Sequence, residues 1–202
     1  MSIQTFGVIG AGQMGNGIAQ VAAMSGLDVI MNDISEEFVR RGMATITKNL
    51  DRAVAKGKLA EDEKEAILGR INISLDLEDM SAADFVVEAA TDREDLKFKI
   101  FSDLDSICSA DVVLSSNTSS IPIGRIAAQT GRPELVIGMH FMNPVPVMKL
   151  VEIIRGMATS DETFQATWDL SVKFGKTPAV ANDFPGFIAN RILMPMINEA
   201  VY

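Results

Sequence analysis

A glycine-rich turn between a strand-like segment and an amphipathic helical segment restricts the fold of this chain more than any other feature. The turn is Gly10-Ala11-Gly12-Gln13-Met14-Gly15, a G-x-G-x-x-G pattern that follows residues 5–9. In a βαβ unit the first glycine permits a tight turn, the second lets the backbone approach a pyrophosphate, and the third lets helix and strand pack closely. The spacing alone is weak in a chain with 15 glycines. Its position between strand and helix makes it informative.

An acidic residue, Asp33, ends the second strand-like segment, residues 28–32, about 20 residues beyond the turn, where a dinucleotide-binding unit carries one. Its carboxylate is expected to accept hydrogen bonds from the adenosine ribose and to repel a 2′-phosphate, so NAD is favoured over NADP. Arg40 and Arg41 lie nearby in sequence, but we expect them on the following helix. The alternative is a turn that serves packing only. It is disfavoured because strand, glycines, helix and acid agree.

Short β-branched runs alternate with longer helical patterns, which is typical of βαβ units and a parallel sheet. Strands are expected at residues 5–9, 28–32, 72–75, 84–88, 112–115 and 135–139, and helices at 14–25, 36–55, 61–68, 96–107 and 123–129. The strands are almost continuously apolar, so helices should cover both faces. The predicted fold class is α/β, a Rossmann-type doubly wound and mostly parallel sheet.

The pattern changes after residue 139. Two prolines make residues 140–147 a loop, residues 148–154 form a strand that can be antiparallel, and residues 177–181 form another strand. Between them lies a helix at 160–174, with Ser160 as its N-cap. Pro185 is expected to open a final apolar helix. We therefore divide the chain into a dinucleotide-binding domain, residues 1–184, and a terminal helix, residues 185–202, whose apolar face must pack against further polypeptide or another subunit.

Charge and cysteine content disfavour several classes of function. The net charge of −9 argues against a nucleic-acid partner, because phosphate backbones need a basic surface. Cys108 is the single cysteine, which permits no intrachain disulfide and fits a reducing compartment. No Cys/His cluster has metal-ligand spacing, so no metal is expected. The chain shows neither a signal peptide nor an apolar run long enough to span a membrane, so we expect a cytoplasmic protein with no membrane partner.

Polar clusters follow three of the expected strands, at residues 92–94, 115–120 and 140–143. Ligands of an open α/β sheet bind at such carboxyl ends. His140 is the only histidine and the side chain best suited to take a proton near neutral pH. Glu152 lies as far beyond Pro146 as His140 lies before it, so a chain that doubles back would bring the two together. The carboxylate would then fix the imidazole tautomer. A lone histidine is more often structural, but this position favours catalysis.

Three longer motifs occur at the same ends: S-N-T-S-S at 116–120, H-F-M-N-P-V-P-V-M-K-L-V-E at 140–152, and D-F-P-G-F-I-A-N-R at 183–191. Together they resemble the 3-hydroxyacyl-CoA dehydrogenase family, which includes 3-hydroxybutyryl-CoA dehydrogenases. The resemblance runs from the first strand to Tyr202. The H-F-x-N-P-x-P segment is far more specific than the glycine pattern.

The resemblance implies oxidation of an L-3-hydroxyacyl-CoA to the 3-ketoacyl-CoA by NAD, or the reverse. His140 would be the general base, Glu152 its partner, and Ser119 and Asn190 contacts to the substrate. Asp92 stands where family members often carry glutamate. The cofactor contacts implied by the turn and by the family are Gly10, Ala11, Gly12, Gln13, Met14, Gly15, Asp33, Asp92, Lys97, Asn117, Ser119 and Asn143.

A row of basic residues in one predicted helix is a candidate binding surface for the coenzyme A portion of the substrate. Lys48, Arg52 and Lys56 recur every four residues and should share one helical face, a possible contact for the coenzyme phosphates. The family likewise implies a substrate contact at Lys56, besides Ser119. Taken alone, a basic face is more often solvated surface. Family members continue into a helical C-terminal domain that closes the acyl site and forms the dimer. The resemblance thus implies a truncated chain that is a homodimer at full length.

Three alternatives stay open. Ser119, His140 and Glu152 have the side chains of a serine-hydrolase triad, although the G-x-S-x-G motif is missing. The chain can also be a non-catalytic dinucleotide-binding fragment. Finally, another hydroxy-acid dehydrogenase of similar fold would reject coenzyme A thioesters.

Overall fold

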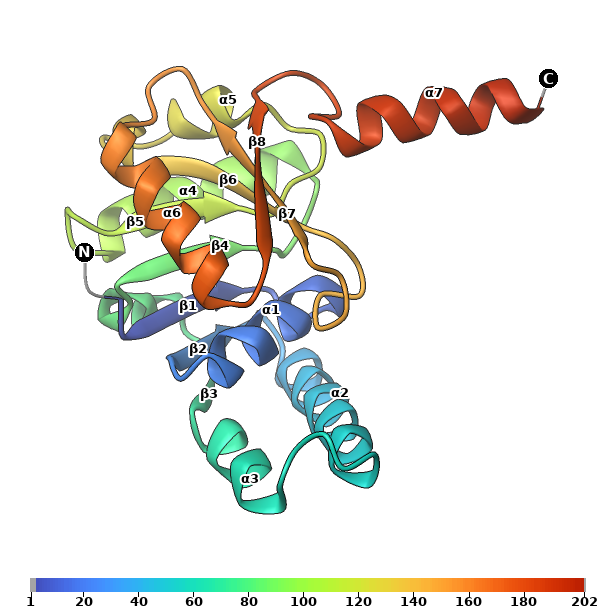
Figure 1. Ribbon diagram of the computed structural model, residues 1–202. Helices are drawn as coiled ribbons and strands as arrows, with labels where there is room; N and C mark the ends of the chain where they lie inside the picture. The colour runs from blue at the N-terminus through green and yellow to red at the C-terminus, as the bar shows by residue number, and fades with distance from the viewer. Residues whose placement is uncertain (1–2, 202) are drawn as a thin grey trace.

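The computed structural model describes residues 3–201 and contains one eight-stranded sheet with helices on both faces (Figure 1). The predicted domain, residues 1–184, and the predicted terminal helix, residues 185–202, include three residues that lie outside the described ones: Met1, Ser2 and Tyr202. The strands are β1 (Thr5–Ile9), β2 (Asp28–Asn32), β3 (Ile71–Ser74), β4 (Phe85–Glu88), β5 (Val113–Ser116), β6 (Val136–Phe141), β7 (Leu150–Arg155) and β8 (Thr177–Asn182). The helices are α1 (Gln13–Met24), α2 (Glu36–Ala55), α3 (Glu61–Gly69), α4 (Glu94–Ile107), α5 (Ile123–Ala127), α6 (Asp161–Lys173) and α7 (Ala189–Val201), with short 3₁₀ helices η1 (Leu77–Ala82) and η2 (Pro133–Leu135).

The strand order is β3-β2-β1-β4-β5-β6-β7-β8, and the first six strands along the chain are parallel. The chain winds outward from β1 to β3 and then crosses to β4 on the other side of β1. The order therefore reverses between β1 and β4, the place where a doubly wound sheet opens a ligand crevice. β7 pairs antiparallel with β6, and β8 lies parallel to β7. The α/β Rossmann-type prediction is confirmed, including the antiparallel strand.

Two apolar clusters pack the sheet between helices. One includes Ile18 of α1, Ile46 of α2 and Phe174 after α6; the other includes Phe101 of α4 and Ile126 of α5. In Figure 1, α6 crosses in front of the sheet while α4 and α5 lie behind it. Helices on both faces explain why the strands are apolar throughout. Within residues 3–201, no helix has the length and apolar character to cross a membrane.

Most predicted elements appear within one or two residues of their expected bounds, and α2 has the predicted bounds. Ser160 caps α6 as expected, because its hydroxyl accepts a hydrogen bond from the Thr163 amide at 3.1 Å. The two 3₁₀ helices were not predicted. One is six residues long and the other three, which is too short to produce a periodic apolar pattern.

The predicted start of the last helix is wrong. Pro185 does not open α7, which begins at Ala189. Gly186 has φ 77° and Phe187 has φ 49°, and these left-handed conformations cannot continue a right-handed helix. Figure 1 shows α7 extending away from the body of the domain, and none of its residues is buried.

Candidate active site

The glycine turn joins β1 to α1. Gly10 has φ 97°, which favours glycine, and its amide donates a hydrogen bond to the Asn32 carbonyl at 2.8 Å. A Cβ atom on Gly15 would lie 1.7 Å from the Gly10 carbonyl oxygen, so helix and turn touch there. A Cβ atom on Gly12, the N-cap of α1, would meet nothing within 4 Å. The first and third glycines are thus required by the fold itself, whereas the second faces open space at a helix N-terminus, where anions bind.

This contrast predicts two different defects. Gly15→Ala should lower the free energy of unfolding by about 3 kcal/mol, because the new methyl group meets backbone that cannot yield. Gly12→Ala should leave stability within about 0.5 kcal/mol of the wild type, since no contact changes. Its NADH affinity should nevertheless fall at least about tenfold, because the methyl group blocks approach to the pyrophosphate. Urea unfolding and NADH fluorescence titration measure the two effects. A Gly12→Ala protein that binds NADH normally would contradict the assignment.

Asp33 lies at the end of β2 beside this turn. Its Oδ2 accepts a hydrogen bond from the Ala11 amide at 2.7 Å, and its Oδ1 accepts one from the Ile34 amide at 2.8 Å. Arg41 lies on α2, as expected, with its guanidinium 5.0 Å from the centre of the Phe38 ring. A cleft of about 530 Å³ opens here, and its lining includes Gly10, Gly12, Asp33, Phe38 and Arg41. Asp33 thus lines this cleft, and its predicted contact with the adenosine ribose stays a prediction.

A second cleft, of about 390 Å³, contains most of the other residues singled out from the sequence. Its lining includes Met14, Asp92, Lys97, Asn117, Ser119, His140, Asn143 and Asn190. Ala90 and Thr91 line both clefts, so the two meet beside the glycine turn. An elongated ligand with a ring at each end and phosphates in the middle fits this shape. The residues present therefore fit NAD.

His140 and Glu152 meet across the antiparallel pair of β6 and β7, where they are direct register partners. His140 Nδ1 lies 2.7 Å from Glu152 Oε2, and both side chains are buried. The other oxygen, Glu152 Oε1, accepts hydrogen bonds from the Ile188 amide at 3.0 Å and the Ala189 amide at 2.8 Å. Ser119 lines the same cleft, but in the described part of the chain no hydrogen bond joins it to His140. The geometry forms a His–Glu pair rather than a serine triad.

Two contacts hold the loops around the pair. Asn117 Oδ1 accepts a hydrogen bond from the Phe141 amide at 2.9 Å, which joins the ends of β5 and β6. Lys176 donates to the carbonyls of Val145 and Met148 and so tethers the proline loop that follows Asn143. Burial lowers the pKa of Lys176. The cleft wall is therefore held from both sides.

Three residues other than His140 and Glu152 test further expectations from the sequence. Lys56 is exposed at the C-cap of α2 and is not among the residues that line the two clefts. Burial raises the pKa of the Cys108 thiol to about 11, so it stays protonated and unreactive at neutral pH. Glu88 was missed as a site residue, although a carboxylate at the end of an apolar strand should have indicated a buried partner. That partner is Lys97.

The chain resembles known dehydrogenases over most of its length. Residues 5–184 match the family model described as "3-hydroxyacyl-CoA dehydrogenase, NAD binding domain". A 3-hydroxybutyryl-CoA dehydrogenase of Bradyrhizobium diazoefficiens is 53% identical over 200 residues, which cover 99% of this chain and 68% of the relative. A probable 3-hydroxybutyryl-CoA dehydrogenase of Deinococcus radiodurans is 55% identical, over 97% of this chain and 70% of the relative. The crystal structure of (S)-3-hydroxybutyryl-CoA dehydrogenase from Ralstonia eutropha superposes with a TM-score of 0.97 at 53% identity, covering 98% and 70% of the two chains.

Proposed function

This chain belongs to the family of 3-hydroxyacyl-CoA dehydrogenase NAD-binding domains, and from that premise we propose that it interconverts a short L-3-hydroxyacyl-CoA and its 3-ketoacyl-CoA. Its cofactor is NAD. The proposed substrate class follows the relatives, which are named for 3-hydroxybutyryl-CoA. The observation that carries the proposed role of this site is the buried pair of His140 and Glu152, 2.7 Å apart, in a cleft that continues past the glycine turn.

The proposed mechanism assigns one task to each polar side chain of the cleft. Bound NAD supplies the acceptor for the hydride that leaves C3 of the substrate. The Nε2 atom of His140 accepts the hydroxyl proton, because Nδ1 is engaged by Glu152. The Glu152 carboxylate stabilises the protonated ring. Ser119 and Asn190, which line the same cleft, orient the reacting oxygen.

A direct spectrophotometric assay of acetoacetyl-CoA reduction tests this proposal. The chain is mixed with NADH and acetoacetyl-CoA, and the loss of NADH absorbance is followed, with NADPH and with free acetoacetate as matched controls. We expect oxidation of NADH that requires the thioester. Binding of NADH without turnover would indicate a dinucleotide-binding fragment. Turnover of free acetoacetate alone would indicate a different hydroxy-acid dehydrogenase.

We further propose that Lys56 binds the coenzyme A portion of the substrate. Lys56, Lys48 and Arg52 are all exposed at one side of α2, where they offer positive charge in an acidic chain. Lys56→Glu is expected to weaken acetoacetyl-CoA binding about tenfold while NADH affinity stays unchanged. The matched control is Lys173→Glu on α6, which makes the same charge change on an exposed residue elsewhere. Calorimetric titration of both ligands measures the effect, and equal weakening by the two variants would refute the assignment.

The division into an NAD-binding unit, residues 1–184, and a separate terminal segment, residues 185–202, is also a proposal. It is supported by the exposure of α7, whose apolar side chains include Ile192, Met196 and Val201. We propose that the protein is a homodimer at full length, in which this face is covered. Sedimentation velocity of the full-length protein gives its mass in solution, and a monomer at high concentration would contradict the homodimer.

A further inference from the structure

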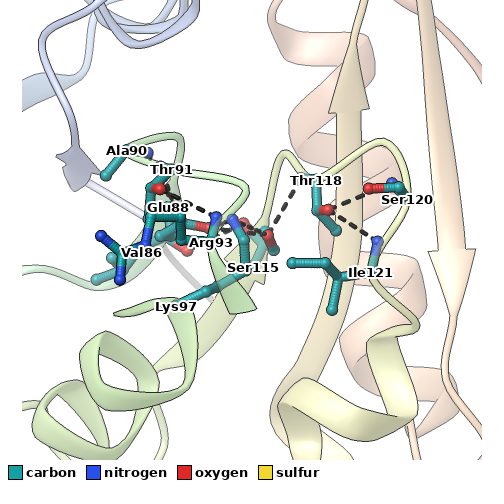
Figure 2. A network of polar contacts seen from close by, with 11 residues as sticks. Val86, Glu88, Ala90, Thr91, Arg93, Lys97, Ser115, Thr118, Ser120 and Ile121 are labelled. Carbon is teal, nitrogen blue, oxygen red and sulfur yellow. Dashed lines mark hydrogen bonds and ion pairs between the residues drawn. The ribbon is translucent and has the colours of Figure 1, made fainter. Parts of the chain in front are cut away.

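Three buried polar side chains form a cluster at the wall of the second cleft. Glu88 ends β4, Lys97 lies in α4 and Ser116 ends β5; their exposed fractions are 0%, 1% and 0%. Lys97 Nζ forms an ion pair with Glu88 Oε2 and lies 3.3 Å from the Ser116 hydroxyl. The Ser116 hydroxyl donates to the same carboxylate oxygen at 2.9 Å. Figure 2 shows Glu88 and Lys97 facing one another from the strand and the helix.

The remaining contacts of this cluster lead to the walls of the cleft. Glu88 Oε1 accepts hydrogen bonds from the amides of Ala90 and Thr91, at 2.9 and 3.3 Å, and both residues line the cleft. Ser116 Oγ accepts one from the Thr118 amide at 3.1 Å, next to Ser119. Figure 2 shows the hydrogen bond to Thr118, at the start of the loop that also contains Ser120 and Ile121. Every oxygen of Glu88 is therefore engaged.

Packing alone does not account for an ion pair at this depth. Removing two charges from water is costly, and an apolar pair of similar volume is often at least as stable. The position of the pair connects it to the cleft, because Lys97 itself lines the cleft together with His140 and Asn143. A buried cation in this wall acts on any charge in the cleft through a medium that screens poorly.

The reaction changes the charge of the cofactor within that cleft. The nicotinamide ring carries a positive charge when oxidised and none when reduced. An unpaired Lys97 would repel the oxidised ring and so favour the reduced cofactor. With Glu88 beside it, the pair is close to neutral and discriminates little between the two forms.

We propose that Glu88 is a positioning residue that neutralises Lys97 and thereby balances the affinities of the site for NAD⁺ and NADH. This inference rests on the proposed function, which places the nicotinamide ring beside His140. The quantity that it concerns is the ratio of two dissociation constants, Kd for NAD⁺ over Kd for NADH.

Four variants separate charge from packing. Glu88→Gln removes the negative charge, so the ratio should rise roughly tenfold. Lys97→Met removes the positive charge and leaves Glu88 uncompensated, so the ratio should fall by a similar factor. The double variant has neither charge and should return to a ratio near that of the wild type. Ser116→Ala is the matched control, because it removes hydrogen bonds without changing charge and should leave the ratio unchanged.

The ratio is measured by calorimetric titration with NAD⁺ and by fluorescence titration with NADH on the same preparation. Both ligands bind the same folded fraction, so partial unfolding of a variant cancels in the ratio. If Glu88→Gln does not fold, Lys97→Met and the double variant still decide the matter. Parallel changes in both affinities, with a constant ratio, would overturn the inference and leave a purely structural ion pair. The measurement needs no acyl substrate, so it can succeed where thioester turnover fails, and the reverse.

Discussion

Replacing His140 with glutamine is expected to lower kcat for acetoacetyl-CoA reduction by about 10²- to 10⁴-fold, the usual contribution of a positioned acid or base. The glutamine amide can donate a hydrogen bond to Glu152 Oε2, the oxygen that lies 2.7 Å from His140 Nδ1, so the local arrangement survives. It cannot take or release a proton at neutral pH. The loss should therefore fall on the chemical step alone.

The accompanying measurements identify that step. NADH affinity, from fluorescence titration, should stay within about twofold of the wild type, because the glycine turn and Asp33 are unchanged. The midpoint of thermal unfolding should shift little, since a buried hydrogen bond is kept. Wild-type turnover in His140→Gln would disprove the role of the imidazole. A loss of NADH binding equal to the loss of turnover would indicate a structural role instead.

Glu152→Gln is expected to be nearly as damaging, by about 10²- to 10⁴-fold in kcat, although it changes one atom and keeps the shape of the side chain. The reason lies in the second oxygen of Glu152, which accepts hydrogen bonds from the Ile188 and Ala189 amides. Only the oxygen of a glutamine amide can occupy that place. Its NH₂ group must then face His140 and donate to Nδ1.

A donor on Nδ1 forces the imidazole proton onto Nε2, the nitrogen left free to face the substrate. In that tautomer the ring has no lone pair available to accept the hydroxyl proton. The kinetic test is a comparison of three variants, because groups that act as one unit give non-additive losses. The double variant His140→Gln with Glu152→Gln should be no slower than the worse single variant. Nearly normal turnover in Glu152→Gln would show that the carboxylate only fills space.

The sequence alone predicted those parts of the site that depend on short, continuous segments of the chain. The glycine turn, the strand before it and Asp33 at the end of β2 are local features, because turn geometry and apolar periodicity depend on nearby residues. The meeting of His140 with Glu152 was also predicted, since a chain that reverses at a proline loop pairs residues equidistant from the reversal. The register of β6 and β7 confirms it.

Contacts between separate elements of the fold were not predicted from the sequence. The buried contact between Glu88 and Lys97 joins a strand to a helix, and neither residue's surroundings can be read from its neighbours in sequence. Asp183 accepts hydrogen bonds from the Ile123 and Gly124 amides at 2.8 Å and so ties the segment before α7 to the start of α5. That contact, together with Glu152, holds residues 185–188 in a turn where the sequence predicted the start of a helix.

Hydrophobic periodicity, glycine spacing and the proline reversal thus determined the Rossmann-type sheet, its cofactor turn and the pairing of His140 with Glu152, because each acts over a short stretch of chain. The tertiary structure decided where α7 begins, which oxygen of Glu152 is free to bind His140, and that Lys97 is neutralised by Glu88. These outcomes depend on which polar groups are left without water when distant segments pack. A buried amide or ammonium must take whatever partner the assembled fold brings near it.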